Sequence, residues 1–131
     1  MPLPEYQSSG AVAFDFICRE RQEISSRSIA LVPGNVIVKI PEGYALFIST
    51  RSSTPAKYGL IIPNAPGIID QDYQGPEDEI KIQVLNILDE PAIIERGERI
   101  AQGTFVKIER GEWEEILHIG ETSRGGFGST G

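Results

Sequence analysis

Apolar and polar residues along this chain alternate in short runs, and no long segment has the 3.6-residue period of an amphipathic helix. Successive side chains of a β-strand point to opposite faces, so alternation with a period of two predicts strands. Aromatic and β-branched residues are frequent in these runs and favour the same interpretation. The predicted strands are residues 11–16, 35–40, 44–50, 79–88, 100–108 and 112–119.

Turn-forming residues separate the predicted strands, in stretches such as "VPGN", "PNAPG", "QGPEDE" and "ERGEW". Many short strands at nearly regular spacing are typical of a β-sandwich or a β-barrel. The chain has 131 residues, which is enough for one domain with a real core. The pattern therefore predicts a single all-β domain.

One short helical turn is expected in "RSSTPAKYGL". Ser53 or Thr54 can cap the turn, Pro55 suits the first helical position, and Gly59 suits the position just past the end. Arg51 and Ser52 come directly before it, and a cation, a hydroxyl and free backbone N–H groups together form an anion site. The local pattern alone favours the alternative, a capped surface turn with a solvated arginine.

Charge and cysteine content exclude several classes of function. The formal net charge is −7, which argues against general nucleic-acid binding, because phosphate contacts need clustered Lys and Arg. Cys18 is the only cysteine, so an intrachain disulfide and a cysteine-based zinc site are excluded. No apolar run is long enough to cross a bilayer, and no signal-peptide pattern is present. We expect a cytoplasmic protein with no membrane partner.

Acid–base chemistry in this chain falls to carboxylates. His118 is the only histidine, so Ser–His and Cys–His nucleophilic arrangements lack their parts. Asp70 and Asp72 follow an apolar pair and would face the same side of an extended chain. A carboxylate at the end of a buried strand, next to the aromatic Tyr73, is well placed to hold a water molecule. The alternative is that both are turn residues.

Asp15 stands inside the apolar run "AVAFDF", where a charge needs a partner or a function. A structural salt bridge is the commoner explanation. Arg99 and Gln102 place a cation and an amide around the start of a strand, and each could be a strand-end residue and nothing more. The acidic stretch "PEDE" (76–79) is interpreted as a solvated turn rather than a metal site.

Five stretches, taken together and in order, resemble the five motifs of the trimeric dUTP diphosphatase (dUTPase) family. They read "AVAFDF", "TRSSTPAKYGL", "NAPGIIDQDYQG", "GERIAQ" and "RGGFGSTG", and they extend from residue 11 to residue 131. The third and fifth are the most specific.

The resemblance implies an all-β fold, a distorted jelly-roll or β-barrel-like domain over residues 1–122, with a flexible C-terminal flap at 123–131. It implies a homotrimer with shared active sites. It also implies hydrolysis of dUTP to dUMP and pyrophosphate with Mg²⁺ as cofactor.

The resemblance further implies roles for individual residues. Asp70 would hold and activate the water that attacks the α-phosphorus. Tyr73 would pack under the deoxyribose and leave no room for a 2′-hydroxyl. The backbone of the 64–75 hairpin, with Asn64 and Gly67, would recognise the uracil edge.

The phosphate-binding roles come from the other motifs. Arg51, Ser52 and Ser53 would contact phosphate oxygens, and Gln102 would help to place phosphate or water. Asp15 would contact the hydrated metal ion as an outer-shell ligand.

The C-terminal motif would supply Arg124 to the phosphates and Phe127 to the base. Three features depart from the common pattern of the family. Ala13 stands where a glycine is usual, the segment 75–86 is longer, and the last motif is two residues shorter. The last departure makes the role of Arg124 the least direct assignment.

Two other functions are compatible with the same scaffold. A dCTP deaminase, or a bifunctional deaminase–diphosphatase, would carry a catalytic glutamate three residues before Asn86, where this chain has Gln83. Glutamine cannot shuttle the proton that deamination requires. The other alternative is a non-catalytic, nucleotide-responsive interaction protein, but Asp70 and the C-terminal motif are both present.

Overall fold

The computed structural model describes residues 1–128, which contain nine strands and one short helix. The elements are β1 (Phe14–Ile17), β2 (Gln22–Ile24), β3 (Ile29–Pro33), β4 (Tyr44–Thr50), α1 (Thr54–Tyr58), β5 (Leu60–Ile61), β6 (Gly67–Ile69), β7 (Lys81–Asn86), β8 (Ala92–Ile94) and β9 (Arg99–Lys107). No helix within these residues is long and apolar enough to cross a membrane.

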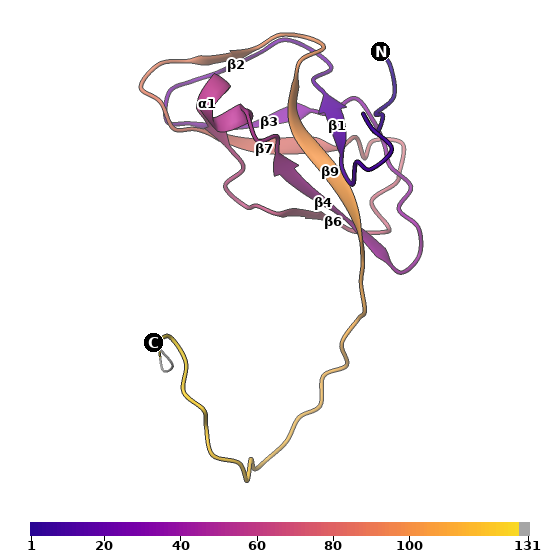
Figure 1. Cartoon of the computed structure of the whole chain (residues 1–131), viewed down its shortest axis with the longest axis vertical. Coiled ribbons are helices and arrows are strands. Elements are labelled where there is room, and N and C mark those ends of the chain that lie inside the picture. The colour runs from indigo at the N-terminus through magenta and orange to yellow at the C-terminus, as the bar shows by residue number, and fades with distance from the viewer. Residues whose placement is uncertain (129–131) are drawn as a thin grey trace.

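The strands form three antiparallel sheets, which together enclose the core (Figure 1). The largest sheet has the order β1-β9-β4-β6, and the others are β2-β8 and β3-β7-β5. Strands from opposite ends of the sequence are paired, since β1 lies against β9 over most of its length. This arrangement confirms the expected all-β, jelly-roll fold class with one short helix.

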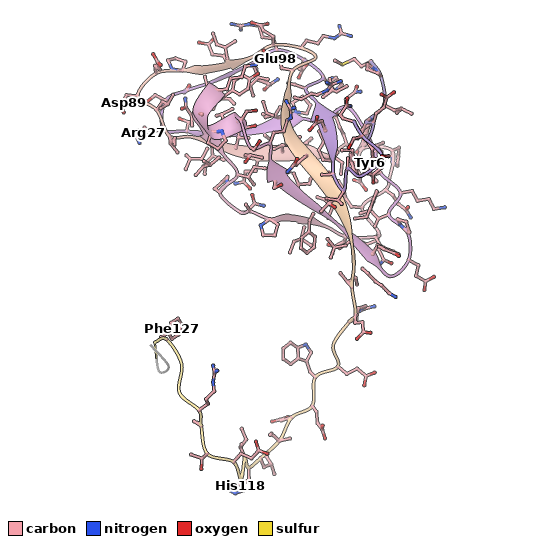
Figure 2. The ribbon with its side chains drawn as sticks, viewed as in Figure 1. Tyr6, Arg27, Asp89, Glu98, His118 and Phe127 are labelled. Atoms are coloured by element: carbon pink, nitrogen blue, oxygen red, sulfur yellow. The ribbon has the colours of Figure 1, made fainter. Side chains whose placement is uncertain are left out.

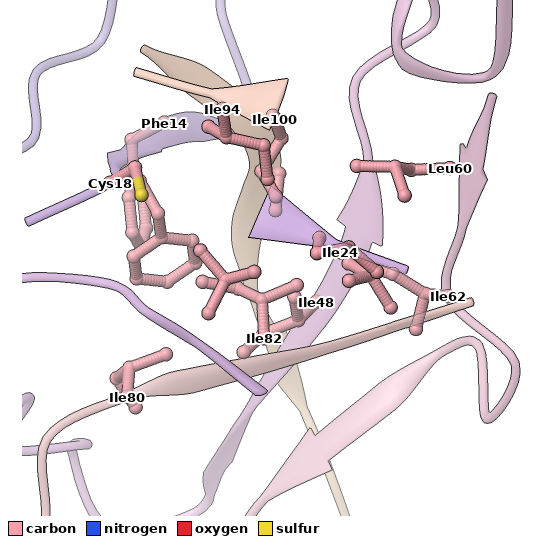
Figure 3. Packing of buried hydrophobic residues seen from close by; sticks show 14 of the residues in the cluster. Phe14, Cys18, Ile24, Ile48, Leu60, Ile62, Ile80, Ile82, Ile94 and Ile100 are labelled. Atoms are coloured by element: carbon pink, nitrogen blue, oxygen red, sulfur yellow. The ribbon is translucent and has the colours of Figure 1, made fainter. Parts of the chain in front are cut away.

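The core lies between the sheets and consists mainly of isoleucine, valine, leucine and phenylalanine (Figure 3). Phe14 and Phe16 pack edge to face, with ring centroids 5.4 Å apart. Gly103 allows this packing. A Cβ atom at that position would lie 2.9 Å from the Phe16 ring and 3.0 Å from the Leu46 side chain. Both side chains would have to move.

Helix α1 forms where the sequence predicts it. Pro55 lies in its first turn, and Gly59 ends it in the left-handed conformation, with φ of 67°. Ser53 occupies the N-cap position but makes no side-chain capping hydrogen bond. The Thr54 hydroxyl donates instead to the Ile100 carbonyl at 2.7 Å, which joins the helix start to β9.

Two predicted strands are not formed. In 35–40, Asn35 adopts a positive φ of 72°, which interrupts the extended backbone, although Val36 still accepts a hydrogen bond from Ile80. The segment 112–119 lies beyond β9 and finds no strand to pair with among the described residues. Residues 109–128 are exposed throughout and lead away from the sheets (Figure 1).

Candidate active site

Three polar side chains form a row across the largest sheet. In the strand register Asp15 of β1 lies opposite Gln102 of β9, and Gln102 lies opposite Ser49 of β4. The Gln102 amide donates to the Ser49 hydroxyl at 3.3 Å. Phe14 and Phe16 on either side of Asp15 are buried, so strand alternation turns Asp15 away from the core.

Arg51 completes this row from the end of β4. Its Nε atom lies 3.1 Å from Asp15 Oδ1, and the Asp15 side chain is only 12% exposed. Its Nη1 atom donates to the Arg99 carbonyl at 3.4 Å. The charge inside the apolar run therefore has a partner. A guanidinium has five N–H donors, and these two contacts leave donors free for an anion.

Ser52 and Ser53 are exposed beside Arg51, at the start of α1. The Arg51 backbone is fixed to β9, because its N–H donates to the Ile100 carbonyl at 3.3 Å. Since the Ser53 hydroxyl does not cap the helix, it is available to a ligand. We call Asp15, Arg51, Ser52, Ser53 and Gln102 the strand-end group.

A second set of predicted residues lies on β6 and the turns around it. β6 is the edge strand of the largest sheet and pairs with β4. Asp70 follows β6 directly, and the Tyr73 N–H donates to the Asp70 carbonyl at 3.3 Å. The chain therefore turns at 71–72, and the expectation that Asp70 and Asp72 share one side of an extended segment is wrong.

Asp70 is exposed and lies at the rim of two hollows. One has a volume of about 130 Å³ and is lined by Asp70, Tyr73, Lys81 and two isoleucines. The other has a volume of about 470 Å³ and includes Tyr44 and Arg110. A carboxylate in this position is accessible both to water and to a ligand.

Asn64 and Gly67 line a neighbouring hollow of about 130 Å³, together with Gln83 and several apolar side chains. Gly67 pairs with Ile48, and a Cβ atom at that glycine would lie 3.3 Å from the Ile48 side chain. This hollow shares Ile68, Ile69 and Lys81 with the hollow that contains Tyr73, so the two are adjacent. We call Asn64, Gly67, Asp70 and Tyr73 the hairpin group.

Asp70 and Arg51 lie toward opposite ends of β4. Leu46 pairs with Ile69, next to Asp70, whereas Thr50, next to Arg51, pairs with Ala101. Thr50 lies four positions after Leu46 along the strand, which corresponds to about 13 Å at about 3.3 Å per residue. Asp70 and Arg51 therefore lie apart within one chain, whereas Gly67 of the hairpin group pairs with Ile48, the neighbour of the Ser49 that bonds to Gln102.

The comparison with known families covers the entire sequence. A family model described as dUTPase matches residues 1–131. The chain belongs to the dUTPase family.

Proteins similar to this dUTPase-family chain come from several bacteria. The deoxyuridine 5'-triphosphate nucleotidohydrolase of Wolinella succinogenes is 42% identical over 131 residues, which cover 98% of this chain and 86% of the relative. That of Rickettsia rickettsii is 41% identical over 133 residues, covering 98% of this chain and 88% of the relative.

Solved dUTPases have the same fold. The dUTPase from Streptococcus mutans matches with a TM-score of 0.80 and 36% identity, over 85% of this chain and 89% of its own. The dUTPase of Staphylococcus bacteriophage 80alpha with dUPNHPP matches with a TM-score of 0.84 and 28% identity, over 99% of this chain and 92% of its own.

The C-terminal candidates of this dUTPase chain contact neither group. Arg124 and Phe127 are both exposed, and Phe127 and His118 lie on the extended segment away from the strands (Figure 2). Residues 129–131 of the expected flap lie outside the described residues. The structure thus leaves the predicted roles of Arg124 and Phe127 as predictions.

The inserted acidic turn has defined partners. Asp78 accepts a hydrogen bond from the Gly75 N–H at 2.8 Å, and Glu79 forms an ion pair with Arg19 at 2.8 Å. The Arg19 guanidinium holds the pKa of the Glu79 carboxyl below its ordinary value. Within residues 1–128 no group of three or more His, Cys, Asp or Glu side chains could hold a metal ion.

Sequence reasoning missed three residues that border the candidate site. Ser49 bonds to Gln102, Lys81 lines the hollow beside Asp70, and the Glu79 carbonyl accepts a hydrogen bond from the Tyr73 hydroxyl at 3.0 Å. Strand register could have indicated Ser49, but no local pattern indicates a tertiary contact through a backbone carbonyl.

Cys18, the only cysteine, is buried. Burial raises the pKa of its thiol, which disfavours the reactive thiolate form.

Proposed function

We propose that this protein hydrolyses dUTP to dUMP and pyrophosphate in the cytoplasm. The observation that carries the proposal is the full-length similarity to deoxyuridine 5'-triphosphate nucleotidohydrolases, at 42% identity over 98% of the chain. The geometry is compatible with this chemistry, since an accessible carboxylate and a separate cationic, hydroxyl-rich group are both present. A single, free Cys18 is in keeping with a reducing compartment.

The strand-end group would bind the triphosphate. Arg51 has unused N–H donors, and the hydroxyls of Ser52 and Ser53 are exposed beside it. Charge-assisted hydrogen bonds from a guanidinium to phosphate oxygens are both strong and directional. Gln102, held by Ser49, would place a phosphate oxygen or a water molecule.

Asp15 suits a hydrated Mg²⁺ better than a directly bound one. Its Oδ1 atom is paired with Arg51, so its second oxygen remains to accept a hydrogen bond from a metal-bound water. Mg²⁺ usually keeps several waters and takes phosphate oxygens with one or two carboxylates. Bound to the triphosphate, the ion would neutralise charge around the reacting phosphorus.

Asp70 would act as the general base. Its carboxylate would take a proton from a water molecule, whose oxygen attacks the α-phosphorus. The bond from that phosphorus to the bridging oxygen breaks, and pyrophosphate leaves while dUMP remains. The position of Asp70 at the rim of two hollows would let it contact both the water and the nucleotide.

The rest of the hairpin group would select the substrate. The Tyr73 ring would pack against the sugar and exclude a 2′-hydroxyl. The backbone near Asn64 and Gly67 would pair with uracil. Cytosine exchanges a donor for an acceptor on that edge, which would leave buried polar groups unpaired.

We propose that the active sites are shared between the chains of a homotrimer. Asp70 and Arg51 must both lie close to one triphosphate, yet about 13 Å of β4 separates their surroundings within one chain. A hairpin group from one chain placed against the strand-end group of another would solve this. Residues 123–131, as a flexible flap after a domain of residues 1–122, would close over the site with Arg124 and Phe127.

The test is pyrophosphate release from dUTP, dCTP, dTTP and UTP under matched conditions, with and without Mg²⁺. We expect dUTP to be hydrolysed with a much higher kcat/KM than the other three, and chelation of Mg²⁺ to lower the rate. Ammonia release from dCTP would favour a deaminase. Absence of turnover by a folded, assembled protein would favour a non-catalytic role.

A further inference from the structure

The side chain of Tyr73 is fixed from two sides. Its ring is partly buried against the core cluster. Its hydroxyl donates to the backbone carbonyl of Glu79 at 3.0 Å, so the outer edge of the ring is tied to a point six residues along the chain. The position of the ring therefore depends on where the Glu79 backbone lies.

The Glu79 side chain is held by three donors. Arg19 Nε donates to Oε2 at 2.8 Å, and Arg19 Nη2 donates to Oε1 at 3.1 Å. The Asn35 backbone N–H also donates to Oε2, at 3.0 Å. Two parallel bonds from one guanidinium fix both distance and orientation. The Glu79 side chain is 21% exposed, so this ion pair is less screened than one on the open surface.

The groups that hold Glu79 are themselves fixed to the sheets. Arg19 lies two residues after the end of β1, and its N–H donates to the carbonyl of Pro33 in β3 at 3.0 Å. Ile80, the neighbour of Glu79, accepts a hydrogen bond from Gly34 at 2.7 Å and donates one to Val36 at 2.8 Å. The position of the Glu79 carbonyl is thus fixed in two ways, by the contacts of the Glu79 side chain and by the backbone hydrogen bonds of Ile80.

We propose that Arg19 and Glu79 are positioning residues that hold the Tyr73 ring at the place where it selects the sugar. This inference rests on the proposed function. A ring that excludes a hydroxyl by contact does so only if it cannot move aside. If the Arg19–Glu79 pair is loosened, the ring can move aside. The kcat/KM for a ribonucleotide then rises relative to that for a deoxyribonucleotide.

The experiment compares kcat/KM for dUTP and UTP in Arg19→Gln and Glu79→Gln. We expect the dUTP-to-UTP ratio to fall about three- to tenfold in both, which corresponds to one weakened hydrogen bond. Arg19→Lys keeps the charge but loses the two parallel hydrogen bonds, so the dUTP-to-UTP ratio should fall less in this variant. The matched control is Arg27→Gln, which breaks the Arg27–Asp89 pair (3.0 Å) on another part of the surface (Figure 2) and should leave the ratio unchanged.

A double-mutant cycle tests whether Arg19 acts through the tyrosine hydroxyl. Tyr73→Phe removes the hydroxyl and keeps the ring, so it should lower the ratio by itself. Adding Arg19→Gln to Tyr73→Phe should lower it little further, because the link is already broken. A purely stabilising ion pair would lower the Tm and leave the ratio unchanged. That result, or two fully additive effects, would overturn the proposal.

A second readout separates this inference from the proposed function. The chain has four tyrosines, and Tyr73→Phe identifies the Tyr73 signals in an NMR spectrum of the protein with ¹³C-labelled tyrosine. Arg19→Gln should shift or broaden those ring signals, and Arg27→Gln should not. If the protein released no pyrophosphate from dUTP, the proposed function would fail. Unchanged Tyr73 signals in Arg19→Gln would instead refute the positioning role.

Discussion

Two inactive variants of this chain are expected to restore activity to each other when they assemble together. Arg51→Gln damages the strand-end group and leaves the hairpin group intact, whereas Asp70→Asn does the reverse. If a site takes its strand-end group from one chain and its hairpin group from another, a mixed trimer contains some sites with both groups intact. Neither variant alone can form such a site.

The size of the recovery follows from the residual activity of each variant and from random assembly of the two. Loss of a general base typically costs about a hundredfold to ten-thousandfold, so the Asp70→Asn trimer should retain about 1% of wild-type activity or less. In an equal, random mixture, the intact strand-end group and the intact hairpin group each come from the suitable chain with a chance of about one half. About a quarter of the sites should then be active.

The assay is pyrophosphate release from dUTP after the two variants are unfolded and refolded together. Size-exclusion chromatography would establish the assembly, and thermal unfolding would show whether Arg51→Gln is folded, since it leaves the Asp15 carboxylate without its partner. The matched control mixes Arg51→Gln with the double variant Arg51→Gln/Asp70→Asn, in which no site has an intact strand-end group. Mixed trimers no more active than this control would show that each site lies within one chain.

Three further outcomes are expected. Deletion of residues 123–131 should lower turnover strongly but leave assembly and Tm unchanged, because the described part of this segment is exposed. Phe127→Ala should lower initial rates less. A truncated protein with the full-length rate would rule out a flap. Asn86→Ala should lower the free energy of unfolding in urea by roughly 3 kcal/mol, because the fully buried amide donates its two N–H groups among three backbone carbonyls and accepts a hydrogen bond from the Leu88 N–H. A loss under about 1 kcal/mol would contradict this. Arg19 lowers the pKa of the Glu79 carboxyl in the folded protein. The stability that the ion pair adds is therefore present above the unfolded pKa of about 4.3 and is lost as the pH falls through the folded-state pKa. The free energies of unfolding of wild type and Glu79→Gln in urea should differ at pH 7 and converge at acidic pH.

Patterns that act within a few residues were sufficient to predict parts of the fold. The alternation in 44–50 matches β4 residue for residue, and Pro55 with Gly59 locates α1, because each of these residues restricts the backbone by itself. The short strands β2, β5, β6 and β8 were not predicted, and neither was the five-residue strand β3. Strands of two or three residues are too short to show a period and are defined by their partners.

The two wrong strand predictions have different causes. Within 35–40 the apolar alternation is real, but the left-handed Asn35 breaks the extended backbone. In 112–119 the apolar residues are exposed, with Trp113 and Leu117 almost fully accessible, because the chain has already left its last sheet. A period of two indicates a strand only when a partner strand is within reach.

The candidate site shows the same limit. The sequence indicated Asp15 because it is a charged residue among apolar ones. The strand pairing places it opposite Gln102. The sequence did not indicate that Arg51 would be its partner, since the contact joins two strands far apart in sequence. Nor could it indicate the link from Arg19 through Glu79 to Tyr73, which depends on the tertiary fold.

The rate of pyrophosphate release from dUTP by Asp70→Asn, relative to the wild-type protein, tests the proposed chemistry most directly. Amide replaces carboxylate at nearly constant shape, so folding and nucleotide binding, measured in parallel by thermal unfolding and calorimetry, should be largely preserved. We expect a loss of turnover of about a hundredfold or more, because no other side chain of the hairpin group can accept the proton. A folded Asp70→Asn protein that binds dUTP and hydrolyses it at close to the wild-type rate would contradict it.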